Sequence, residues 1–99
     1  MIGKNQIRSG ADELCKKFRI KYLGVFGSIA RGEESAGSDI DFFAEFEDPT
    51  PETMADRYFG FIVEAEKKFN CPVQVLTPRM VSNPFLKKSI MRDLVAVYE

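Results

Sequence analysis

The chain contains no histidine, and only two of its 99 residues are cysteine. Without histidine it cannot build a Ser-His-Asp or Cys-His catalytic unit, a His-ligated zinc site or a histidine pH switch. The glycine patterns of P-loop and Rossmann phosphate sites are missing as well. These absences exclude several common classes of hydrolase and nucleotide-binding protein.

Long apolar segments are also missing. No apolar run approaches the ~20 residues that a transmembrane helix needs, and residues 1–5 lack the apolar core of a signal peptide. Cys15 and Cys71 do not have C-x-x-C spacing, so they are interpreted as free thiols. We therefore expect a cytoplasmic protein without membrane association, formed by residues 1–99 as a single domain of ordinary composition.

The net charge is small, but the charged residues are unevenly spread along the chain. The net charge is −1, yet residues 33–66 carry eleven acidic side chains and one basic side chain. Residues 1–32 carry seven basic against two acidic side chains, and residues 67–99 carry six against two. The acidic middle can attract a cation, whereas the basic flanks suit either phosphate or plain solvation. This balance does not support a large nucleic-acid footprint, so nucleic acid is not expected as the main partner.

Apolar periodicity predicts an alternation of helices and strands, which indicates an α/β (α+β) fold. The strand at residues 20–26 is apolar on both faces and should therefore lie in the interior of a sheet. The segment at residues 94–98 is compatible with a helical tail, but its β-branched valines favour a strand. The expected order is helix 5–19, strand 20–26, a helical turn at 28–31, strand 39–46, helix 51–69, strand 72–76, helix 84–90 and strand 94–98.

The helix at residues 51–69 has two apolar stripes. We expect the second stripe, Met54 and Phe61, to pack on a neighbouring helix, with a partner interface as the alternative. Gly60 inside the helix costs about 1 kcal/mol relative to alanine, which suggests close packing there. In the following helix, Leu86 and Ile90 are expected to point inward. The predicted core stripe comprises Ala55, Tyr58, Phe59, Ile62, Ala65 and Phe69.

Two short motifs carry the chemistry. Gly27-Ser28 lies at a strand-to-helix turn, where backbone N–H groups face outward and can bind phosphate. After ten intervening residues, Asp39-Ile40-Asp41 begins a strand. Side chains alternate between the two faces of a strand, so both carboxylates lie on one face. A pair of carboxylates suits Mg²⁺, which also takes oxygen ligands from substrate phosphates. Each motif is weak alone, but their conjunction predicts a site for a triphosphate and a metal.

Two charged residues near these motifs have open assignments. Arg31, three residues after Ser28, can face the phosphates or pair with Asp39 or Glu34. Glu45 shares the face of the two aspartates but lies roughly 13 Å further along the strand, at ~3.3 Å per residue. We expect Glu45 to face solvent.

With these motifs the chain resembles the minimal nucleotidyltransferases (MntA-like) of the DNA polymerase β-like nucleotidyltransferase superfamily. The resemblance covers nearly the whole chain and implies the nucleotidyltransferase fold, a small mixed β-sheet flanked by helices. It implies that a nucleoside monophosphate passes from an NTP, ATP being expected, to an acceptor hydroxyl. Gly27, Ser28 and Arg31 would bind the nucleotide, while Asp39 and Asp41 would be catalytic and hold two Mg²⁺ ions. Many members of the family are antitoxins of HEPN ribonuclease toxins, and some adenylylate a tyrosine of the toxin.

One position departs from the family pattern. The family carries a third carboxylate on the third strand, whereas this chain has Gln74 between two strand valines. An amide oxygen can ligate a metal, but it brings no charge and cannot accept the proton of the acceptor hydroxyl. Two hypotheses follow. One is an active nucleotidyltransferase, and the other is a weak or inactive antitoxin-like module that still binds nucleotide or a toxin partner.

Overall fold

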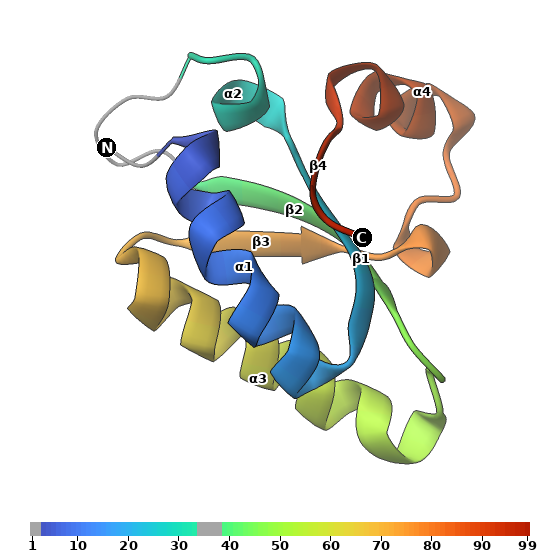
Figure 1. Ribbon diagram of the computed structural model, residues 1–99. Helices are drawn as coiled ribbons and strands as arrows, with labels where there is room; N and C mark the ends of the chain where they lie inside the picture. Colours follow the sequence, from blue (N-terminus) through green and yellow to red (C-terminus); the bar gives the residue numbers. More distant parts are fainter. Residues whose placement is uncertain (1–2, 34–38) are drawn as a thin grey trace.

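The computed structural model describes residues 3–33 and 39–99, and its elements follow the predicted order (Figure 1). The final segment forms a strand, as its valines indicated. The elements are α1 (Lys4–Phe18), β1 (Ile20–Phe26), α2 (Gly27–Ala30), β2 (Ile40–Phe46), α3 (Pro51–Phe69), β3 (Val73–Leu76), the 3-10 helix η1 (Pro78–Met80), α4 (Pro84–Asp93) and β4 (Val95–Tyr98).

The four strands form one mixed sheet in the order β3-β2-β1-β4. Strand β1 runs antiparallel to both of its neighbours, β2 and β4, and β2 runs parallel to β3. The predicted mixed sheet flanked by helices is therefore confirmed. Across the described residues, no helix combines the length and apolarity needed to cross a membrane.

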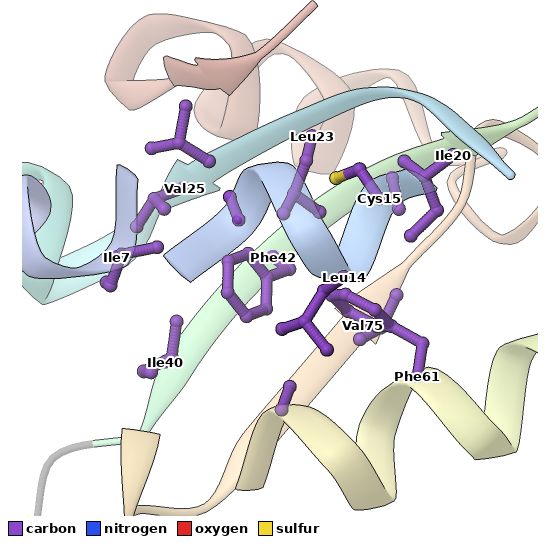
Figure 2. Packing of buried hydrophobic residues seen from close by; sticks show 14 of the residues in the cluster. Ile7, Leu14, Cys15, Ile20, Leu23, Val25, Ile40, Phe42, Phe61 and Val75 are labelled. Atoms are coloured by element: carbon purple, nitrogen blue, oxygen red, sulfur yellow. The ribbon is translucent and has the colours of Figure 1, made fainter. Parts of the chain in front are cut away.

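The main core lies between the sheet and helices α1 and α3, which cover the same face (Figure 1). Phe42 of β2 is fully buried there, with its ring centroid 5.5 Å from that of Phe61 on α3 (Figure 2). Phe18, at the end of α1, approaches Phe61 edge-on at 6.2 Å. Aromatic pairs of this kind add about 0.5–1.5 kcal/mol beyond the burial of their surface. They bind the two helices and the central strand into one unit.

The opposite face of the sheet carries a smaller cluster of Phe43, Val81 and Ile90, against which Phe26 is half-buried. Helix α4 supplies Ile90 and so covers part of this face. Strand β1 is therefore buried on both sides, as predicted from its sequence. Leu86 was wrongly expected to point inward, because only Ile90 reaches the sheet and Leu86 is 45% exposed.

The inward face of α3 agrees only in part with the predicted one. Ala65 and Phe69 are buried as expected, and Tyr58 and Ile62 pack against the core, whereas Ala55 is exposed. Phe59, assigned to the core stripe, is 62% exposed, whereas Phe61 is fully buried. The inward face thus combines Met54 and Phe61, the stripe expected to pack on a neighbouring helix, with Ala65 and Phe69 of the predicted core stripe. A Cβ at Gly60 would lie 2.8 Å from the ring of Phe18, which confirms the close packing expected there.

Arg57 on α3 is a buried cation that periodicity did not reveal, with 8% of its surface exposed. Its Nε donates to the carbonyl of Phe18 at 3.0 Å, and its Nη2 donates to those of Arg19 at 2.8 Å and Glu47 at 2.6 Å. Its Nη1 donates to the carbonyl of Asp48 at 3.1 Å. Burial and, to a lesser degree, the charge of Arg19 lower the pKa of Arg57. The guanidinium thereby joins the α1–β1 connection to the turn that follows β2.

We expect Arg57→Lys to lower the free energy of unfolding by about 2–4 kcal/mol, because an ammonium group cannot reach four separated carbonyls and leaves buried acceptors unpaired. Urea denaturation followed by circular dichroism measures the change. Arg79→Lys, at an exposed position of η1, is the matched control and should stay within about 0.5 kcal/mol of the wild type. Equal transition midpoints for the two variants would contradict this role of Arg57.

Candidate active site

The site begins at the turn between β1 and α2. Gly27 follows the last residue of the strand and has a φ of 76°, a conformation that side chains with a Cβ rarely adopt. A Cβ built on Gly27 would overlap the Oδ2 atom of Asp41. Glycine is therefore required twice, for the backbone conformation and for the approach of the Asp41 carboxylate to the turn.

Helix α2 is held in place by its own apolar residues. Ile29 and Ala30 are buried, and the amide of Glu33 donates to the carbonyl of Ser28 at 2.8 Å. The first amides of a helix have no acceptor within the helix. Gly27 and Ser28 therefore bring backbone donors and one hydroxyl to the edge of the Asp41 carboxylate.

The two aspartates lie at the start of β2. Asp39 precedes the strand and is exposed, while Asp41 is half-buried and is paired with Phe26 of β1. Burial raises the pKa of Asp41, and the negative charge of Asp39 raises it further, while Arg31 acts in the opposite direction. Two carboxylates with this mutual repulsion are suited to share a cation.

A divalent metal fits the oxygen donors present here. The parts of the chain that the structure describes contain no cluster of three or more His, Cys, Asp or Glu residues placed to hold a metal. The protein can therefore offer the two carboxylates of Asp39 and Asp41. Mg²⁺ is commonly held by one or two carboxylates and completes its shell with water and phosphate oxygens. The donor set matches that chemistry better than it matches zinc.

Gln74 lies directly beside the aspartates. In the parallel pair of β2 and β3, Asp41 is the register partner of Gln74. The neighbouring residues Val73 and Val75 pack into the main core, so Gln74 projects from the opposite face, together with Asp41, and is exposed. The structure thus places an uncharged amide next to the carboxylate pair.

Arg31 is held by two carboxylates. Its Nε donates to Glu33 at 2.7 Å, and its Nη1 donates to Asp93 at 2.8 Å. Of the two pairings considered from the sequence, Asp39 is not its partner, and Glu34 lies outside the described residues. The ion pair with Asp93 ties α4 to the end of α2, and sequence spacing could not reveal a contact across 62 positions.

A second contact that the sequence did not reveal brings another cation to α2. The Nζ of Lys4, at the start of α1, donates to the carbonyl of Ala30 at 3.2 Å. Glu45, by contrast, lies at the far end of β2, with Lys21 Nζ 3.9 Å away, and its side chain is partly exposed. Lys4 of α1 and Asp93 of α4 thus both contact the segment of α2.

We expect Gly27→Ala to destabilise the fold more than Gly32→Ala. Both glycines have positive φ angles, 76° and 75°, so each substitution carries the left-handed strain of about 1–2 kcal/mol. Only at Gly27 does the new Cβ meet another group, because nothing lies within 4 Å of a Cβ built on Gly32. Thermal unfolding of the two variants compares them directly, and equal melting temperatures would contradict the close approach of Asp41.

Comparisons with known proteins agree with this geometry. The nucleotidyltransferase domain family model matches residues 7–97. A protein of Methanocaldococcus jannaschii, whose name places it among the protein adenylyltransferases, is 35% identical over 94 residues, which cover 95% of this chain and 93% of that protein.

Solved structures share the fold. One described as a minimal nucleotidyltransferase superimposes with a TM-score of 0.76 at 23% identity, covering 95% of each chain. A chain from the complex of a tri-AMPylated Shewanella oneidensis HEPN toxin with MNT antitoxin gives a TM-score of 0.67 at 11% identity, over 96% of this chain and 71% of that one. The expected fold and the interpretation as a nucleotidyltransferase enzyme are confirmed, and the chain belongs to the nucleotidyltransferase domain family.

Proposed function

We propose that this enzyme transfers AMP from ATP to a hydroxyl group of a partner protein. The observation that supports the proposal is the close approach of the Gly27 turn to the Asp41 carboxylate. Backbone amides that can donate hydrogen bonds to phosphate would then lie beside a carboxylate that can bind a metal. The relative from Methanocaldococcus jannaschii supports an adenylyl group and a protein acceptor, because its name contains both.

Each site residue has a role in this reaction. Gly27 lets the backbone approach the phosphates, and the Ser28 hydroxyl and nearby amides donate hydrogen bonds to them. Asp39 and Asp41 would hold Mg²⁺, with two ions expected from the family resemblance. The metal supplies charge neutralisation of the phosphates and orientation of the α-phosphorus for in-line displacement.

The transfer needs one bond to form and one to break. The acceptor oxygen bonds to the α-phosphorus, the bond to the pyrophosphate oxygen breaks, and the proton of the hydroxyl passes to solvent.

Arg31 already carries two ionic partners, Glu33 and Asp93, and lies close enough to Asp41 to lower its pKa. We assign Arg31 to the nucleotide side of the site, where it balances the negative charge of the phosphates and carboxylates.

For the acceptor we propose a tyrosine of a HEPN-type toxin, with this chain acting as the antitoxin. The structural likeness to a chain in a complex that contains a tri-AMPylated HEPN toxin supports this choice of partner. A cytoplasmic location is consistent with the two free thiols, Cys15 and Cys71.

Asp39→Asn/Asp41→Asn should abolish transfer, because the amides cannot hold the metal as carboxylates do. The wild type and variants are incubated with α-labelled ATP, Mg²⁺ and a candidate HEPN-type toxin, and label on the toxin is counted. Glu45→Gln removes a carboxylate from the same strand face and should retain activity. Label transfer by the double variant at the wild-type rate would refute the assignment of the metal ligands.

A second candidate function, an antitoxin-like module with a weak or vestigial site, has the amide of Gln74 in its favour. We expect Gln74→Asp to create or increase transfer, since it places a third carboxylate beside Asp41 where it can bind metal and accept a proton. Gln74→Asn, which shortens the side chain without adding charge, is the control. An unchanged rate in Gln74→Asp would mean that this position does not act on the metal or the acceptor.

A further inference from the structure

The outer face of α4 is unusual in its combination of side chains. Ile90 points into the sheet and is 2% exposed. At 3.6 residues per turn, Phe85, Lys88 and Arg92 lie at i, i+3 and i+7 on the side of the helix away from Ile90. Phe85 is 82% exposed. The helix therefore presents one aromatic ring and two cations to the surroundings, and we call these three residues the α4 face.

This face has the composition of a docking surface. Leu86 and Met91 flank it and are also exposed, so apolar area extends to both sides of the ring. Among the described residues, Lys88 takes part in no ion pair, and Arg92 has a single carboxylate neighbour at 3.7 Å, Asp93. Interfaces are enriched in aromatic and arginine side chains, and a few such residues carry most of the binding energy. A partner that covers this face needs an apolar socket and negative charge.

The C-terminal end of α4 lies next to the segment that carries Arg31. The last residue of α4, Asp93, holds Arg31 at the end of α2, and the two helices lie beside each other (Figure 1). On the sheet side, Ile90 packs with Phe43, which is one pleat beyond Asp41 on the same strand face. Arg92 of the α4 face lies 3.7 Å from Asp93, so a partner seated on the C-terminal part of this face would lie beside the end of α2 that carries Arg31.

We propose that the α4 face docks an acidic segment of the protein acceptor, with the ring of Phe85 inserted into an apolar socket of that protein. The proposal deepens the proposed function, on which its choice of a protein acceptor rests. Docking at this position keeps the acceptor hydroxyl near the α-phosphorus and raises its effective concentration there. Charge favours protein over nucleic acid as the occupant, because the chain has a net charge of −1 and an acidic middle segment.

The test compares two double variants of the full chain. Phe85→Ser/Lys88→Glu alters the α4 face, and Phe59→Ser/Lys67→Glu makes the same changes at an exposed ring and an exposed lysine of α3. Isothermal titration with a candidate HEPN-type toxin, such as the Shewanella oneidensis HEPN toxin of the similar complex, measures affinity without requiring turnover. A fluorescent ATP analogue reports nucleotide binding, a fluorescent 20-nucleotide RNA reports nucleic-acid binding, and circular dichroism reports folding.

We expect the α4 variant to raise the Kd for the toxin by about tenfold or more, with folding and nucleotide affinity unchanged and the α3 variant close to wild type. Equal toxin affinity in the α4 variant, or no toxin binding by the wild type, would overturn the proposal. So would loss of RNA binding alone, which would identify nucleic acid as the occupant. Toxin binding without label transfer would count against the proposed function only, and the measured affinities would still decide the role of α4.

Discussion

The contact between Gly27 and the Asp41 carboxylate is the constraint on which the site depends. It requires the register in which Phe26 of β1 faces Asp41 of β2, and a shift of one residue would turn Asp41 into the core. That register is fixed by residues outside the site. Ile40 and Phe42, on either side of Asp41, are fully buried on the helical face. The position of the carboxylate is therefore set by the hydrophobic packing of its neighbours.

One face of the sheet forms the hydrophobic core, and the other face carries the candidate site. Helices α1 and α3 cover one face and bury nearly all of the large apolar side chains. The other face is covered only in part, by the small cluster around Phe43 and Ile90. This incomplete cover leaves Asp41 and Gln74 accessible. Helix α4 lies on the same face and is attached to the end of α2 through Arg31 and Asp93. Asp41 and Gln74 therefore share the less covered face of the sheet.

Much of this arrangement could be predicted from the sequence because it depends on short-range patterns. The period of two placed Asp39 and Asp41 together, and the apolar faces of residues 20–26 placed that strand inside the sheet. The same patterning placed Gln74 next to the aspartates once the third strand was recognised.

The errors and omissions have a different physical origin. Both Phe59 and Phe61 fit an amphipathic helix, and only the position of the Phe18 ring beside Gly60 decides which of them faces the core. The Arg31–Asp93 pair joins distant segments through charges that have no periodicity. In the sequence, Arg57 looks like an ordinary polar position of a helix, since most of its hydrogen bonds go to main-chain carbonyls that any sequence would supply.

Because Arg57 binds mainly main-chain carbonyls, the fold can tolerate substitutions at the residues that carry those carbonyls. Its four shortest hydrogen bonds go to the carbonyls at positions 18, 19, 47 and 48, and a carbonyl survives every substitution. The side chains at these positions can drift independently of the arginine, so pairwise covariation between relatives would not detect the link. What must be inherited is the path of the backbone, and a redesign of either turn would have to keep the spacing of its carbonyls rather than the identity of its residues.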